Sequence, residues 1–248
     1  MFRKALLLCA LVLALSMGAA QAADKKVVTV ASDCTWPPME YLDDNKKPTG
    51  FSVDLLAEME KVMDVKFQIQ NTAWDGIFSG VAAGKYDMVS SSVTITDERK
   101  KVYLFSEPYY NVVQAVVMPK DKSISSLDEL KGKKVGGQIG TTGIFVMDKA
   151  KTGAEVKEYE DVGLAMEDMR NGRIDAVICD SNVAAYYANK KEGFENLFHV
   201  AFQTEEVEHL AFCLKKDNEE LVKLLNEGLA KVKANGKYDE VLARWMGE

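Results

Sequence analysis

The sequence predicts an α/β protein with two similarly built lobes, each a mainly parallel sheet flanked by helices. Short β-branched segments alternate with helical patterns of about 10–15 residues, which is typical of βαβ units. Two long extended apolar runs, 111–118 and 207–214, interrupt this alternation. A glycine that ends a helix and precedes a strand occurs at Gly84 and again at Gly172. We therefore expect the two runs to be hinge strands that cross between related lobes.

The first segment of the chain has the features of a secretory signal peptide. Two basic residues precede the apolar stretch Ala5–Leu15, and a small-residue A-x-A motif ends at Ala22. The apolar stretch is shorter than the ~20 residues of a membrane span, which disfavours a membrane anchor. We expect residues 1–22 to be cleaved and the remaining chain to be exported and soluble.

Strands and helices follow in alternation after this segment. The expected strands are Val27–Ala31, Lys66–Gln70, Asp87–Ser90, Lys134–Gly137, Val156–Tyr159 and Asp175–Cys179. Helical periodicity places the apolar residues of Phe51–Met63 on one face. Ser126 and Glu129 form the pattern of a capping box and predict a short helix, and a further helix is expected at Asn182–Asn189.

The order of these elements divides the chain after the signal peptide into two lobes. Lobe 1 is expected to comprise residues 23–112 and 210–248, and lobe 2 residues 113–209. Ligands of open α/β sheets bind beyond the carboxyl ends of the strands. The two binding edges should therefore face each other across a cleft.

The charge of the chain disfavours nucleic acid and anionic membranes as partners. Without residues 1–22, 29 Lys and Arg stand against 38 Asp and Glu, a net charge of −9. An acidic protein repels the phosphates of both partners.

The usual patterns of catalytic and cofactor sites are missing. The sequence contains no H-E-x-x-H, G-x-S-x-G or P-loop motif, and the glycine spacing of residues 136–143 does not fit a dinucleotide site. The two histidines, His199 and His209, fall in or beside the return crossing and are expected to have structural or surface roles. We expect no enzyme activity, no cofactor and no metal site.

Three cysteines remain after the signal peptide: Cys34, Cys179 and Cys213. They form no C-x-x-C motif and have no histidine cluster near them, so a zinc site is not expected. One disulfide with one free thiol and three buried free thiols are both compatible with the sequence.

Two features favour binding of a carboxylate. The loop at residues 136–143 joins a strand to a helix, where free backbone N–H groups attract anions, and Thr141 and Thr142 add hydroxyl donors. The alternative for this loop is a simple helix cap. Arg99 follows a polar strand end, and a guanidinium can bind a carboxylate through two parallel hydrogen bonds. The alternative is a surface arginine paired with a local acid.

Other features favour binding of a cationic group. Asp180 ends an apolar strand, where it can hold an ammonium or simply cap the next helix. Asp33 ends the first strand, where it can face the ligand or cap its own loop. Trp36 and Trp74 stand at junctions between loops and regular elements, as aromatic walls of a pocket or as core residues.

Five motifs in this order resemble the periplasmic polar amino acid-binding proteins of ATP-binding-cassette importers. The motifs are DCTWPPME at 33–40, GFSVDL at 50–55, SSVTITDER at 91–99, FSEPYY at 105–110 and QIGTTG at 138–143. The resemblance covers nearly the whole chain after the signal peptide. It implies a type II periplasmic-binding-protein fold, a periplasmic location, a monomer and delivery of an amino acid to a membrane permease.

The resemblance also implies that ten residues bind the ligand in three groups. The groups are Arg99, Thr141 and Thr142 for the α-carboxylate; Asp180, Ser92 and Thr94 for the α-ammonium; and Asp33, Trp36, Trp74 and Ser91 for the side chain. The acid at Asp33 and the aromatic walls favour arginine, lysine or histidine as the ligand, while glutamine and other polar amino acids remain open. Cys34 and Met39 depart from the usual residues of the family and leave the side-chain pocket less defined.

Cyclohexadienyl dehydratases are similar to the same family and provide the alternative function. Such an enzyme needs a positioned general acid, for which Glu40 or Asp33 could serve, and has little use for an ammonium clamp. The complete set of Arg99, Thr142 and Asp180 favours a binding protein.

Overall fold

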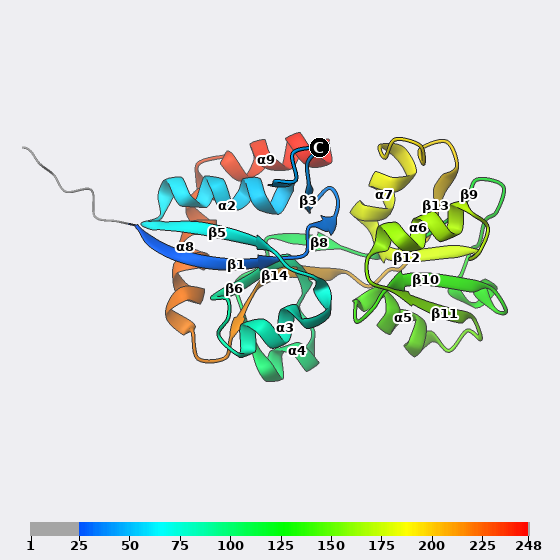
Figure 1. Ribbon diagram of the computed structural model, residues 1–248, viewed down its shortest axis with the longest axis horizontal. Coiled ribbons are helices and arrows are strands. Elements are labelled where there is room, and N and C mark those ends of the chain that lie inside the picture. The colour runs from blue at the N-terminus through cyan, green and yellow to red at the C-terminus, as the bar shows by residue number, and fades with distance from the viewer. Residues whose placement is uncertain (1–24, 248) are drawn as a thin grey trace, which may run out of the picture.

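The computed structural model describes residues 25–247. Figure 1 shows two α/β units side by side, each with a sheet between helices, and the chain passes between them twice. The predicted signal peptide, residues 1–22, lies outside the described residues. Within the described range, no helix has the length and apolar character needed to cross a membrane.

The first sheet contains both parallel and antiparallel strands. Its members are β5 (Val65–Asn71), β1 (Lys26–Ser32), β6 (Met88–Thr94), β14 (Glu208–Lys215) and β7 (Tyr103–Phe105) in spatial order, with β8 (Tyr110–Val112) also paired to β14. Strands β5, β1 and β6 run parallel, whereas β14 is antiparallel to its three partners.

The second sheet repeats this plan. Its spatial order is β11 (Glu155–Tyr159), β10 (Lys134–Gln138), β12 (Ala176–Asp180), β9 (Gln114–Pro119) and β13 (Phe198–Gln203). Strands β11, β10 and β12 run parallel, and β9 is antiparallel to both of its neighbours, β12 and β13. The predicted α/β class is confirmed, and all six predicted strands occur. One antiparallel strand in each, β14 in the first and β9 in the second, makes both sheets mixed.

The two extended runs cross between the sheets as expected, but neither crossing is one continuous strand. The run 111–118 is split at Val113 into the end of β8, in the first sheet, and β9, in the second. The return passes through residues 204–207, which connect β13 to β14. The crossings themselves are therefore short stretches outside the strands, although the Thr204 N–H still donates to the Gln114 carbonyl of β9.

Helices cover both faces of each sheet (Figure 1). The first unit has α2 (Phe51–Val62), α3 (Trp74–Ala82), α4 (Asp97–Val102), α8 (Glu219–Ala234) and α9 (Lys237–Met246); the second has η1 (Leu127–Leu130), α5 (Thr142–Ala150), α6 (Val162–Arg170) and α7 (Ser181–Asn189). A small antiparallel sheet of β2 (Thr35–Trp36), β3 (Glu40–Leu42) and β4 (Pro48–Thr49) precedes α2. Helix α2 packs on α8 and α9, so the C-terminal helices complete the first unit.

The predicted capping box at Ser126 and Glu129 is wrong. The predicted helix exists only as the 3-10 turn η1, and the Ser126 side chain makes no capping hydrogen bond. Glu129 instead accepts hydrogen bonds from the backbone N–H and the hydroxyl of Ser125. Two serines are adjacent in the sequence, and in the folded chain Glu129 pairs with Ser125 and not with Ser126.

The internal repeat between the two units is confirmed at the level of single residues. Gly84 and Gly172 both adopt a left-handed backbone, with φ of +72° and +70°, directly after a helix. Asp87 and Asp175 follow them at the same spacing, and each accepts a 2.7 Å hydrogen bond from a backbone N–H of the neighbouring strand, β1 or β10. The two units therefore share their strand order and their local bracing.

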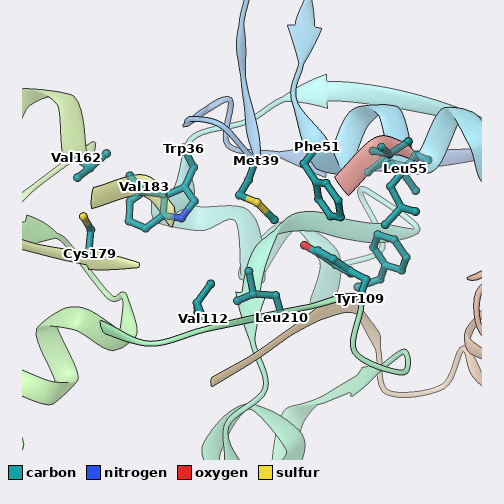
Figure 2. Close-up of a cluster of buried hydrophobic side chains, with 14 of the residues drawn as sticks. Trp36, Met39, Phe51, Leu55, Tyr109, Val112, Val162, Cys179, Val183 and Leu210 are labelled. Atoms are coloured by element: carbon teal, nitrogen blue, oxygen red, sulfur yellow. The ribbon is translucent and has the colours of Figure 1, made fainter. Parts of the chain in front are cut away.

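One apolar cluster extends from the first unit into the second. Figure 2 shows Trp36 and Met39 of the first unit in the same cluster as Val162, Val183 and Cys179 of the second. Burial of apolar side chains stabilises the contact between the units. Trp36 thus serves in the core and, as shown below, in the pocket.

The three cysteines of the described chain are buried and free. Of the two cysteine arrangements compatible with the sequence, this supports the one with three buried free thiols. Burial raises the pKa of the Cys34 and Cys213 thiols to about 12, so both are protonated at neutral pH.

Candidate functional site

A single pocket between the two sheets is lined by all ten predicted ligand residues. The lining residues are Asp33, Trp36, Trp74, Ser91, Ser92, Thr94, Arg99, Gln138, Thr141, Thr142 and Asp180. The pocket has an empty volume of about 320 Å³, which is at the small end of the range for small-molecule sites. Only Gln138 was absent from the predicted set.

The pocket forms where the parallel strands of the two sheets end. Asp33 follows β1, and Thr94 ends β6 in the first sheet. Gln138 ends β10, and Asp180 ends β12 in the second sheet. This is the expected edge of an open α/β sheet, because the carboxyl ends of parallel strands lie together.

A bulge in β6 explains why two consecutive serines line the pocket. Successive residues of a regular strand point to opposite faces. Between the paired positions Val89 and Val93, β6 has more residues than β14, and Ser92 adopts a φ of +46°. Such a bulge redirects side chains, so that both Ser91 and Ser92 reach the pocket.

The Arg99 guanidinium spans the two units. Its Nη1 donates to the Thr94 carbonyl at 2.9 Å and its Nη2 to the Gly140 carbonyl at 3.2 Å. The guanidinium lies 5.5 Å from the centre of the Trp74 ring and 5.0 Å from that of Phe78, within cation–π range. No ion pair to Arg99 occurs within residues 25–247, so the alternative of a surface arginine paired with a local acid is wrong.

Asp180 does not cap the helix that follows it. Its side chain makes no hydrogen bond to the first turn of α7. Its Oδ2 accepts from Trp36 Nε1 at 3.1 Å and its Oδ1 from Gln114 Nε2 at 2.8 Å. Burial, followed by the negative charge of Glu208, raises the pKa of Asp180 to about 7. A cation bound beside this carboxyl would favour its ionised form.

Asp33 connects the first sheet to the second. Its Oδ2 accepts from Gln138 Nε2 at 2.7 Å, and its Oδ1 accepts from the Thr35 hydroxyl at 2.9 Å. Burial raises the pKa of this carboxyl. The local bond to Thr35 agrees with a role in the loop, and the bond to Gln138 places the second oxygen between the two units.

The N-terminus of α5 faces the pocket with hydroxyls that do not cap it. Thr141 is the N-cap residue, but its hydroxyl donates to the Gln138 carbonyl at 2.7 Å instead of satisfying a helix N–H. The Thr142 hydroxyl donates to Glu208 Oε2 at 2.7 Å and lies 3.4 Å from the Thr94 hydroxyl. The helix N-terminus therefore keeps its attraction for an anion.

Three residues in and around the site were not predicted from the sequence. Gln138 lies in the QIGTTG motif, and its position at the end of a strand was the signal that could have identified it as a pocket residue. Gln114 and Glu208 lie on the crossing strands β9 and β14, where no local pattern marks them. Both act on residues far away in the sequence, which only the fold brings close.

The histidines take no part in the pocket. His199 pairs with the Lys122 carbonyl and His209 with the Asn111 side chain, as expected for structural or surface roles. In the part of the chain that the structure describes, no group of three or more His, Cys, Asp or Glu residues could hold a metal ion.

Comparisons with known proteins agree with the predicted resemblance. The family model for bacterial extracellular solute-binding proteins, family 3, matches residues 28–248. A "Probable histidine-binding protein" of Neisseria gonorrhoeae is 37% identical over 228 residues, covering 90% of this chain and 84% of the relative. The "L-cystine-binding protein TcyJ" of Escherichia coli K12 is 32% identical, with the same coverage.

A solved structure supports the fold as well. An ancestral arginine-binding protein bound to arginine superimposes with a TM-score of 0.84 at 34% identity, covering 90% of this chain and 99% of that protein. The type II periplasmic-binding-protein fold is thereby confirmed. All three proteins are named as binding proteins and not as enzymes, which agrees with the prediction of a binding protein.

Proposed function

The chain belongs to the bacterial extracellular solute-binding proteins, family 3, and from this premise we propose that it binds an amino acid with a cationic side chain. The bound amino acid is delivered to the membrane permease of an ATP-binding-cassette importer. The observation that carries the proposal is the placement of Arg99, Asp180 and Asp33 around one pocket.

The charges at the pocket support a ligand with two positive groups and one negative group. Asp33 and Asp180 line the pocket from opposite sheets, and among the described lining residues Arg99 is the one basic side chain. A charge taken out of water is tolerated only where an opposite charge and hydrogen bonds replace the water. A cationic α-amino acid supplies one partner for each of these three charges.

The α-carboxylate and the α-ammonium would each bind groups from both units. Arg99 and the N-terminus of α5 provide the positive environment for the carboxylate, with Thr141 and Thr142 beside them. The buried Asp180 provides the negative charge for the ammonium, and Ser92 of the first unit lines the same pocket. Only an arrangement that brings both units together offers the full set of contacts.

The ligand side chain would bind between Asp33, Gln138 and the aromatic walls. Gln138 already pairs with Asp33, so a ligand cation would find the carboxylate held in place. Trp36 and Trp74 line the pocket from the first unit. A cation over such a ring gains roughly 0.5–2 kcal/mol.

The two units would move as lobes about the crossings. We infer that lobe 1 comprises residues 23–112 and 210–248 and that lobe 2 comprises residues 113–209. The crossings at Val113 and residues 204–207 lie outside the strands and can change their backbone angles. The protein would act as a monomer and export would place it in the periplasm.

A thermal-shift screen of the twenty amino acids and L-cystine tests the proposal. A ligand at 100 times its dissociation constant adds about 2.7 kcal/mol of stability. L-arginine, L-lysine or L-histidine should give the largest shift. A larger shift with L-glutamine or L-cystine would contradict the cationic ligand, and no shift with any of them would contradict amino acid binding.

A further inference from the structure

Glu208 joins the two units directly behind the pocket. It begins β14, immediately after the return crossing. Its Oε2 accepts a hydrogen bond from the Thr94 hydroxyl at 2.9 Å and another from the Thr142 hydroxyl at 2.7 Å. Thr94 belongs to β6 of the first sheet, whereas Thr142 begins α5 of the second unit. One carboxylate oxygen therefore holds together two elements that would separate when the lobes open.

The hydrogen-bond partners fix the direction of both hydroxyl protons. An ionised carboxylate can only accept, so Thr94 and Thr142 must each donate their single proton to Glu208. Gln114 Nε2 donates to the Thr142 oxygen at 3.1 Å, which agrees with this direction. Both hydroxyls can therefore offer a ligand only a lone pair, which suits an ammonium and not a carboxylate.

The same chain of hydrogen bonds extends to the pocket carboxylate on the second sheet. Gln114 Nε2 donates to Asp180 as well as to Thr142. The backbone of Gln114 exchanges hydrogen bonds with Thr204, at the start of the return crossing. The network thus includes residues at both crossings and pocket-lining groups of both units, Thr94 of the first and Thr142 and Asp180 of the second.

We propose that Glu208 is a positioning residue that ties the lobes in their closed arrangement and thereby slows the release of the bound amino acid. This inference rests on the proposed function, because it assumes that the pocket between the lobes holds the ligand. Glu208 itself does not line the pocket and acts through the hydroxyls of Thr94 and Thr142. The inference also assigns the α-carboxylate to Arg99 and the α5 backbone alone, because the Thr142 hydroxyl already donates its proton to Glu208.

Dissociation rates of three Glu208 proteins test the tie. Stopped-flow measurements would use L-arginine, L-histidine and L-cystine with the wild type, Glu208→Ala and Glu208→Gln. Loss of two hydrogen bonds to a charged acceptor should speed release from Glu208→Ala by about 10–100-fold, with little change in association. Glu208→Gln keeps a carbonyl oxygen for both hydroxyls and should stay within about threefold of the wild type.

Glu206→Ala is the matched control. Glu206 is exposed, lies two residues away and gives the same change in net charge. Its release rate should equal that of the wild type. Glu208→Asp serves if the alanine variant folds poorly, because a side chain one methylene shorter keeps the charge but cannot reach both hydroxyls, and it should release ligand faster.

Several outcomes would overturn the tie. Release from Glu208→Ala at the wild-type rate would do so. Release from Glu208→Gln as fast as from Glu208→Ala would also do so, because the charge of the side chain would then matter and not its acceptor geometry. Failure of the wild type to bind L-arginine, L-lysine or L-histidine would instead contradict the proposed function. The tie would then be decided by small-angle scattering of the free proteins, where Glu208→Ala should have a larger radius of gyration than the wild type and Glu206→Ala. Equal radii would overturn it.

Discussion

The two units of the molecule have the same scaffold but present different chemistry at the ends of their strands. Strand β1 corresponds to β10 and β6 to β12, in the same spatial order within each sheet. Yet β1 leads to the carboxylate of Asp33, whereas β10 ends in the amide of Gln138. After β6 the chain supplies the cation Arg99, and β12 ends in the anion Asp180.

This difference shows how a repeated fold can build a site for a zwitterion. Corresponding positions carry complementary groups, and some of them meet directly, as Asp33 and Gln138 do at 2.7 Å. Neither unit alone has both a cation for the ligand carboxylate and a carboxylate for its ammonium in place. The site is complete only when the units close, so changes on either side should remove binding without unfolding the protein.

The largest effect is expected from removing the cation of the first unit. Arg99→Ala should keep the fold but cost about 2–5 kcal/mol of binding, because a carboxylate loses its charge-assisted pair in a closed site. This corresponds to roughly 30-fold to several thousandfold weaker affinity for L-arginine in isothermal titration calorimetry. Arg173→Ala, which removes an exposed arginine paired with Asp168, is the control and should bind normally. A loss below threefold in Arg99→Ala would show that the ligand carboxylate does not bind there.

The anion of the second unit should make binding dependent on pH. Asp180 has a pKa raised to about 7 and must be ionised to pair with the ligand ammonium. Affinity should therefore fall as pH decreases below about 7, by about 100-fold at two units below, since each pKa unit corresponds to 1.36 kcal/mol. Calorimetry between pH 5 and 8 measures this slope. Asp180→Asn should bind weakly with a much flatter profile, and an unchanged slope in that variant would assign the pH dependence to another group.

A second buried carboxyl, in the first unit, should affect stability instead of binding. Glu40 is fully buried, its Oε2 accepts from the Ser52 hydroxyl at 2.6 Å, and burial raises its pKa to about 8. The folded protein keeps this proton while the unfolded chain, with its ordinary pKa, loses it. The stabilising contribution is thus complete at low pH and is lost as pH rises toward about 8.

Urea unfolding at several pH values measures this contribution. The free energy of unfolding should fall by about 1–3 kcal/mol more in the wild type than in Glu40→Gln between pH 5 and 8.5. The glutamine keeps the hydrogen bond to Ser52 but cannot titrate. Parallel pH profiles for the two proteins would mean that Glu40 is already ionised in the folded state.

The smallest effect concerns selectivity, at Asp33. Asp33→Asn keeps the shape of the side chain and removes its charge, so L-arginine and L-lysine should lose about 1–2 kcal/mol more than L-glutamine. Competition binding with the three amino acids measures the difference. Asp44→Asn, which alters a nearby exposed aspartate, should leave the order of affinities unchanged. Equal loss for all three ligands would assign Asp33 to the loop that it shares with Thr35.

Much of the fold was predictable because its signals are local. Short extended segments alternate with helical patterns along the chain, and Gly84 and Gly172 stand at helix ends, where both adopt a left-handed backbone. The pocket residues were predictable where they end strands or stand in short motifs. The antiparallel directions of β9 and β14 were not, because strand direction within a sheet depends on partners far away in the sequence.

The missed residues show where local signals fail. Gln114 lies on a crossing strand, and its side chain donates to Asp180, 66 residues away. Glu208 meets Thr94 and Thr142 across 114 and 66 residues. When two residues are this far apart in the sequence, the fold determines whether they meet. The same side chain in another fold would face water.

Small-angle scattering with and without L-arginine tests the central claim most directly, since the site is held to be complete only when the two units close on an amino acid. The wild type should show a smaller radius of gyration at saturating L-arginine, because ligand favours the closed arrangement. Arg99→Ala at the same concentration should keep the radius of the free protein. A wild-type profile that stays unchanged while calorimetry shows saturation would contradict closure of the two units around the ligand.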